Sequence, residues 1–175
     1  NRERLRLRFG FKGKVNEEIN LNTRFSTAGG NTSTNQTYGP NFPGYALFID
    51  QAYFTYQPQG LKSLTTYGGK MKNFFSTSPL LWDTDTNPDG LGQEFTTGSL
   101  VLRAAEWTTL TNTTSNQGVY AYQVGFHTDL WGVFLSAYNH TSIPAAFNDL
   151  LLEFQFSPFN LSLNFAQDSA ISSEN

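Results

Sequence analysis

The sequence contains no cysteine, one methionine and two histidines among its 175 residues. The absence of cysteine excludes a disulfide-stapled scaffold, a thiolate metal site and a cysteine nucleophile. Charged residues make up 14% of the chain and the net charge is -3, so the basic surface that nucleic-acid binding requires is missing. No segment approaches the roughly 18 consecutive apolar residues of a membrane-spanning helix. A transmembrane β-strand is compatible with this composition, because it needs only about 9–11 residues, half of them polar.

A strict alternation of apolar and polar residues begins near the N-terminus. Between residues 3 and 15, large apolar side chains fall on one face of an extended chain, and basic side chains or glycine fall on the other. A period of two residues predicts a β-strand. The apolar face consists of Leu5, Leu7, Phe9 and Phe11, and the opposite face consists of Arg4, Arg6, Arg8, Gly10, Lys12 and Lys14.

Short turns and long polar connections alternate along the chain. Residues 16–18 and 58–62 form tight turns, whereas residues 28–44 and 75–90 form long loops. Outer-membrane barrels have this arrangement, with short turns on the periplasmic side and long loops outside. We therefore predict an all-β fold, an antiparallel transmembrane β-barrel. The expected strands cover residues 3–15, 19–26, 46–57, 63–74, 91–97, 99–107, 119–128, 133–140, 149–156 and a last strand marked by Leu161, Leu163 and Phe165.

Ten strands are fewer than the about 16 to 18 of a wide barrel. Both ends of the sequence look cut, so we interpret residues 1–175 as part of a single barrel domain. Two strands must fit between Leu91 and Trp107, and Gly98 joins them. The first of these is short for a membrane span, which indicates that residues are missing near Gly98.

Several segments resemble known outer-membrane proteins. Residues 6–29, which include RFGFKG, resemble a recurring hairpin of Gram-negative porins. The segments IDQAY (49–53), GKMKN (69–73) and LWDTDTNPDG (81–90) resemble the bacterial "putative porin" family more closely. This resemblance implies a water-filled barrel in the outer membrane, in contact with lipid and lipopolysaccharide and often a homotrimer. It would pass small hydrophilic solutes and ions, with no catalysis and no cofactor.

Basic residues concentrate on the predicted inward faces of the first strands. Of 11 Lys and Arg residues, six lie between Arg2 and Lys14. Charged residues that face the lumen of a barrel control its ion selectivity, and a positive wall attracts anions. The alternative interpretation is the solvated face of a soluble sheet. We predict that the pore-lining residues are Arg4, Arg6, Arg8, Lys12, Lys14, Arg24, Lys70 and Lys72.

The loop at residues 75–90 is acidic, with Asp83, Asp85 and Asp89 in it. Folded inward, it would oppose the basic wall and create a transverse field at a constriction. The spacing of Asp85, Asn87 and Asp89 also matches the first half of a calcium-binding loop. The glutamate that would close such a loop is missing, because Thr96 occupies its position. A Ca²⁺ site is therefore the weaker interpretation.

Aromatic residues near the expected strand ends predict two interfacial girdles. They are Trp131 and Phe159 at tight turns, and Tyr45, Phe74, Trp82 and Trp107 near long loops.

Three alternatives to a channel stay open at this point. A soluble β-sandwich that binds carbohydrate would pack its apolar faces against each other. A closed barrel with a filled lumen would act as an anchor or adhesin and would not conduct. A membrane-barrel lipase would use Asn139, His140 and Ser142, but no third group or oxyanion site accompanies them in the sequence.

Overall fold

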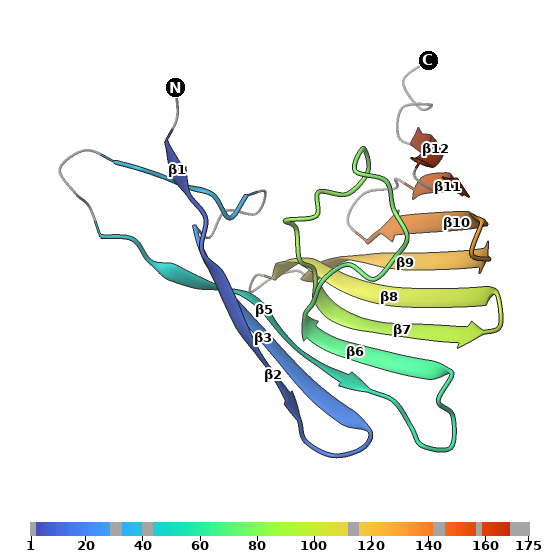
Figure 1. Ribbon diagram of the computed structural model, residues 1–175, viewed down its shortest axis with the longest axis horizontal. Coiled ribbons are helices and arrows are strands. Elements are labelled where there is room, and N and C mark those ends of the chain that lie inside the picture. Colours follow the sequence, from blue (N-terminus) through green and yellow to red (C-terminus); the bar gives the residue numbers. More distant parts are fainter. Residues whose placement is uncertain are drawn as a thin grey trace.

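A computed structural model describes residues 3–28, 33–39, 44–111, 116–141, 146–156 and 159–168. Ten strands pair antiparallel in one sheet, in the order β12-β11-β10-β9-β8-β7-β6-β5-β3-β2 (Figure 1). The prediction of ten antiparallel neighbours is confirmed. The strands are β2 (Arg8–Lys14), β3 (Ile19–Thr27), β5 (Leu47–Tyr56), β6 (Leu64–Lys70), β7 (Asp89–Thr97), β8 (Leu100–Thr111), β9 (Asn116–His127), β10 (Trp131–His140), β11 (Ala146–Phe156) and β12 (Phe159–Asp168).

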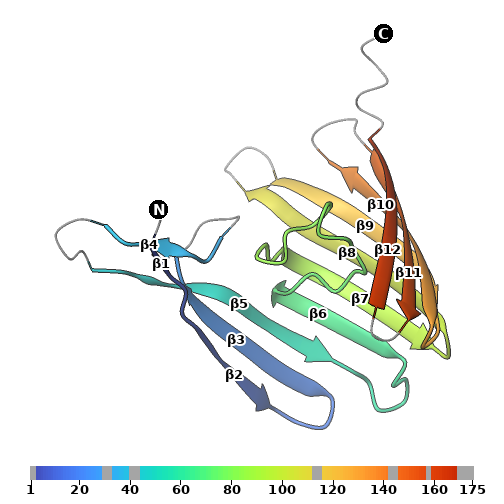
Figure 2. The same ribbon diagram turned by 45° about the horizontal axis from the view of Figure 1, so that its top comes forward.

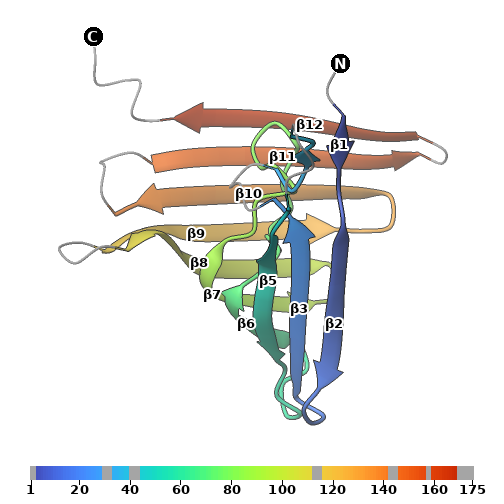
Figure 3. The same cartoon turned by 90° about the vertical axis from the view of Figure 1, so that its left-hand side faces the viewer.

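The sheet curls around a concave face without closing, so the fold is a partial β-barrel (Figures 1 and 2). Its edges are β2 and β12. The sheet is also twisted, since β2, β3 and β5 run across the direction of β9–β12 (Figure 3). None of the described residues forms a helix long and apolar enough to cross a membrane.

The convex face of the sheet is apolar and exposed. Phe11, Tyr122, Leu135 and Phe165 are 67%, 50%, 52% and 60% exposed, although each belongs to a paired strand. In β10, side chains at alternate positions are buried on the concave face, as the period of two requires. No second sheet covers the convex face among the described residues. This arrangement rules out the β-sandwich alternative, in which apolar faces would pack against each other.

The first expected strand is interrupted. β1 (Arg4–Leu5) pairs with β4 (Gln36–Thr37) in a separate two-stranded sheet, and β2 begins at Arg8. Arg4 therefore lies outside the ten-stranded sheet, whereas Arg8, Lys12 and Lys14 share a face of β2.

The fourth expected strand ends early, at Lys70 rather than at residue 74. Gly69 and Gly90 are register partners at this end, with φ values of +114° and +154°. A Cβ at either position would collide with backbone atoms of the neighbouring strand. The two glycines thus allow a distorted strand end that other residues could not adopt. Residues 71–88, called the 71–88 loop below, leave the sheet here and fold over its concave face (Figure 1).

A β-bulge explains why the third expected strand has no clean apolar face. Thr23 and Arg24 pair with Ala52 and Gln51, but Phe25 pairs with Ile49. Asp50 is the extra residue, so the alternation is shifted there by one position. Asp50 is consequently buried, although in a regular strand it would share a face with Ala52, which is exposed.

The strand after the 71–88 loop is longer than expected. β7 has nine residues and pairs with β8 without a register shift, from Asp89 to Thr97. The turn at Gly98 joins the two strands as predicted. A span of nine residues is within the range for a transmembrane strand, so the short span that suggested missing residues near Gly98 is not observed.

Candidate functional site: a loop across the concave face

The 71–88 loop is attached to β8–β10 by aromatic side chains. The ring of Phe75 lies 5.2 Å from that of Trp107 and 6.1 Å from that of Tyr138, and Trp82 lies 5.1 Å from Trp107. Trp107 is only 3% exposed. These rings, with Val119 and Ala121, form a hydrophobic cluster on the concave face.

This cluster corrects part of the predicted girdles. Trp107 is covered by the loop, and Phe74 and Trp82, which belong to the loop, pack against the same cluster on the concave face instead of the lipid interface. Phe74 stacks on Tyr67 at 4.5 Å. Trp131, in contrast, is 40% exposed and packs beside Phe126 on the convex face. Phe159 and Tyr45 are also exposed, at 75% and 37%.

Polar contacts fix the same part of the loop. The backbone N–H of Ser76 donates to Oε1 of Gln123 at 3.0 Å, and its carbonyl accepts from Nε2 of Gln123 at 2.7 Å. Nη1 of Arg103 donates to Oγ of Ser76 at 3.0 Å and to Oε1 of Gln123 at 2.6 Å. Nε of Arg103 in turn pairs with Glu94 at 2.6 Å.

The far part of the loop reaches the basic N-terminal strands. The carboxylate of Asp85 pairs with Arg8 at 2.6 Å and with Arg6 at 2.9 Å. These residues are separated by 77 and 79 positions in the sequence. Burial raises the pKa of Asp85, but the hydrogen bond and charge of Arg8, together with Arg6, outweigh it and leave the pKa below its usual value.

A second carboxylate, from the bulge, continues this ionic contact. Asp50 pairs with Nε of Arg24 at 2.5 Å and lies 4.0 Å from Nε of Arg8. Nδ2 of Asn87 donates to Asp50 at 2.7 Å, and Gln51 donates to Oδ1 of Asn87 at 2.8 Å. Asn87 therefore connects the end of the loop to β5.

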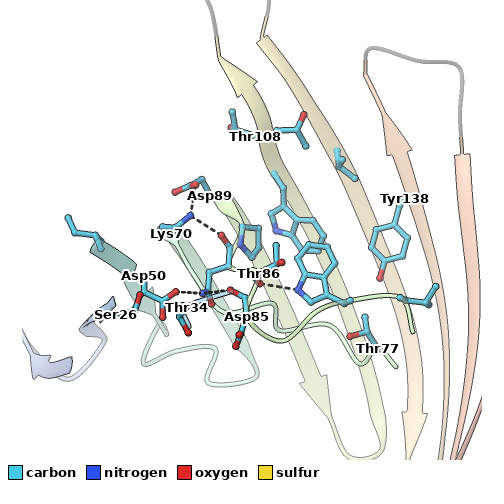
Figure 4. Close-up of a pocket in the computed structure, with 18 of the residues that line it drawn as sticks. Ser26, Thr34, Asp50, Lys70, Thr77, Asp85, Thr86, Asp89, Thr108 and Tyr138 are labelled. Carbon is cyan, nitrogen blue, oxygen red and sulfur yellow. Dashed lines mark hydrogen bonds and ion pairs between the residues drawn. The ribbon is translucent and has the colours of Figure 1, made fainter. Parts of the chain in front are cut away.

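A cavity of about 840 Å³ lies between the loop and the adjoining ends of the strands. Figure 4 shows Asp50, Asp85 and Lys70 on one side of it and Tyr138 on the other. Its lining is mixed, since charged groups from β5 and β6 face aromatic rings from β8 and β10. The opposed charges on one side of this cavity favour polar solutes over an apolar ligand.

Comparison with known proteins agrees with this geometry. The family model described as "Putative porin" matches residues 1–137. The chain belongs to the putative porin family. No curated protein matches the sequence. Membership of this family supports a porin-like outer-membrane channel.

The porin's predicted basic residues do not all lie together. Arg6, Arg8 and Arg24 meet at the acidic contacts of the loop and the bulge. Lys14 pairs instead with Glu17 in the turn after β2, at 2.7 Å. Lys12 lies on the same face, opposite Asn22 of β3.

Lys70 and Lys72 lie at the end of β6, where Lys70 reaches the cavity under the loop, and their pore-lining role stays a prediction. Lys70 pairs in register with Ala52, on the side of the sheet where Phe54 lies over Gly68. Its ammonium bends at the strand end to the carbonyl of Asn87 and to Asp89, at 3.0 Å each. Lys72 is exposed beyond the end of β6, because the strand stops at Lys70.

The three acidic residues of the predicted loop at 75–90 also lie in different surroundings. Only Asp85 faces the basic wall; Asp83 is exposed and accepts the N–H of Asp85, and Asp89 begins β7 beside Lys70. Asp85, Asn87 and Asp89 each contact different partners. Among the described residues, no group of three or more acidic, histidine or cysteine side chains could hold a metal ion. Calcium binding stays a prediction of the sequence.

The lipase alternative gains nothing from the structure. Asn139 and His140 are neighbours on β10, so their side chains leave opposite faces of the sheet, and Ser142 lies outside the described residues.

Sequence reasoning missed three residues of the site: Asp50, Gln123 and Arg103. Asp50 was hidden by the bulge. Arg103 and Gln123 had a weak signal, since each is a long polar residue at an inward position of an alternating strand.

Proposed function

We propose that this porin is a general diffusion channel for small hydrophilic solutes and ions, and that the 71–88 loop narrows its pore. The observation that carries the proposal is the course of the loop. It crosses the concave face from the cluster around Trp107 to β2, where Asp85 pairs with Arg6 and Arg8. A loop held at both ends across the curved sheet reduces the open cross-section and thereby sets a size limit.

The charges at this crossing support an electrostatic filter. Arg6 keeps 40% of its side chain exposed while it pairs with Asp85, so solutes can approach the guanidinium directly. Opposed charges at a narrow point create a local field that favours some ions over others. The pore-lining set that we propose is Arg6, Arg8, Arg24 and Lys12 on the wall, with Asp85 on the loop.

The surrounding surfaces fit the same function. The exposed apolar residues of the convex face would contact lipid, whereas the polar concave face would contact water. Assembly as a homotrimer, which the family resemblance implies, belongs to the proposal, and chemical cross-linking in detergent would test it.

The decisive experiment is single-channel conductance of the purified full-length protein in a planar bilayer, with a salt gradient. We expect stable open steps. Asp85→Asn removes a negative charge beside two arginines, so the anion-to-cation permeability ratio should rise about twofold or more.

Asp83→Asn is the matched control, since Asp83 lies in the same loop but is exposed and has no ion pair among the described residues. It should change the ratio less than Asp85→Asn does. An intact barrel that never conducts would contradict the channel, and equal ratios in both variants would contradict the filter.

A further inference from the structure

We propose that Gln123 and Arg103 are positioning residues that hold Ser76, which we call the root of the 71–88 loop, over the pore. The inference rests on the proposed function, because the position of the loop matters only if solutes pass beside it. According to this proposal, two residues of the strands, outside the loop itself, control the shape of the constriction.

The side-chain amide of Gln123 makes all the hydrogen bonds of which it is capable. Its Oε1 accepts from Ser76 N and from Arg103, and its Nε2 donates to Ser76 O and to Oγ of Ser136 at 2.8 Å. An amide has two acceptor and two donor positions, and all four are satisfied here. Gln123 is 3% exposed, its bond to Ser136 is buried, and its bonds to Ser76 and Arg103 are partly buried.

The bonds to Ser76 replace those of a missing strand neighbour. A residue in a sheet satisfies its N–H and its C=O with the backbone of an adjacent strand. Ser76 has left the sheet, and the side chain of Gln123 supplies both partners from the middle of β9. The backbone of the loop is therefore fixed at this residue whatever side chain it carries.

Arg103 sets the orientation of that amide. A guanidinium can only donate, so Oε1 of Gln123 must face Arg103 and Nε2 must face away from it. Arg103 is itself held by Glu94 and lies 6.0 Å from the centre of the Phe134 ring. Its Nη1 also donates to Oγ of Ser76, which gives the loop a further contact.

This attachment differs from the one at Asp85. The contacts of Ser76 are mostly between neutral groups and are partly buried, whereas the pairs of Asp85 are ionic and Arg6 is 40% exposed. Salt and acid weaken exposed ion pairs more than buried amide bonds. Ser76 should stay in place when high salt or acid releases Asp85 from the arginines. Gln123 should therefore control the position of the loop independently of the ion pairs of Asp85.

The test uses the absence of cysteine from the chain. Ser78→Cys places one thiol in the loop at a position that is 5% exposed, and the serine hydroxyl has no hydrogen-bond partner to lose. A charged maleimide can label this thiol in the detergent-solubilised full-length protein only when the loop lifts. Gln123→Glu keeps the size and an acceptor for Arg103 but removes both donors.

We expect Gln123→Glu to raise the labelling rate of the Ser78→Cys protein about tenfold, as the loss of one or two hydrogen bonds predicts. Ser76→Ala removes only the contact to Arg103 and should raise the rate about two- to threefold. It keeps the inference testable if Gln123→Glu does not fold. Ser136→Ala is the matched control, since it removes a bond of Gln123 that does not reach the loop.

Conductance of the same proteins separates the two proposals. A higher or fluctuating conductance in Gln123→Glu, with an unchanged level in Ser136→Ala, would support the positioning role. Labelling rates that are equal in all variants would overturn it, even if the wild-type protein conducts. A wild-type protein that is silent in the bilayer would instead overturn the channel, whatever the labelling shows.

Discussion

The two halves of the sheet share their convex face and differ in their concave face. Exposed apolar residues cover the outside of both, with Phe11 on β2 and Phe165 on β12 as examples. Inside, β2 and β3 present several arginines that meet carboxylates, whereas β8–β10 present aromatic rings, a neutral amide and one arginine, Arg103, which pairs with Glu94. No Lys or Arg follows Arg103 in the sequence.

This contrast explains how one part of the loop can stay attached to the sheet while another part is released by changes of pH or salt. The 71–88 loop is packed against β8–β10 through Phe75, Trp82 and Ser76, where dispersion and partly buried hydrogen bonds hold it. It meets β2 through Asp85, where charge holds it. The first attachment resists changes of pH and salt, and the second depends on them.

The largest effect on stability should come from the aromatic cluster that attaches the loop to β8–β10. Trp107→Ala removes a ring that is 3% exposed and contacts both Phe75 and Trp82, so we expect a loss of about 3–5 kcal/mol in unfolding free energy. Denaturant unfolding of the refolded protein, followed by heat-modified migration on a gel, would measure it. Trp131→Ala, on the convex face, is the control and should cost much less. Equal losses would mean that the loop cluster contributes no special stability.

An intermediate effect should come from acid on the ionic side. The pKa of Asp85 in the folded protein lies below its ordinary value of 3.8, so its contacts stabilise the loop fully above that value. They are lost as the pH falls through the lowered pKa. Ion selectivity of the wild-type protein should stay constant between about pH 7 and pH 5, and should approach that of Asp85→Asn only below the ordinary carboxyl pKa of 3.8. Convergence of the two proteins already at pH 5 would contradict the lowered pKa.

The smallest effect should come from an ion pair outside the loop contacts. Lys14 and Glu17 pair at 2.7 Å, but their side chains are 54% and 74% exposed. Lys14→Ala should therefore change the unfolding free energy by less than about 1 kcal/mol and leave the selectivity at low salt nearly unchanged. A large shift in selectivity would mean that the turn end of β2, and not the contact at Asp85, filters ions.

The sequence by itself determined most of the strands and, in regular strands such as β2, their two faces. Alternation from Arg8 to Lys14 placed the basic residues on one side of β2 and Phe9 and Phe11 on the other, because a strand has a period of two. Turn chemistry placed the junction at Gly98, and short turns alternating with long loops gave ten antiparallel neighbours. All of this is local information, readable within about ten residues.

Only the tertiary structure decided where the loop goes and which residues it meets. Asp85 finds Arg6 and Arg8 more than 70 positions away, and Ser76 finds Gln123 at a separation of 47. The bulge at Asp50, which turns that carboxylate inward, depends on how β5 pairs with β3. Such contacts arise from the curvature of the whole sheet, which brings distant strands under one loop. No pattern within a single strand contains that curvature.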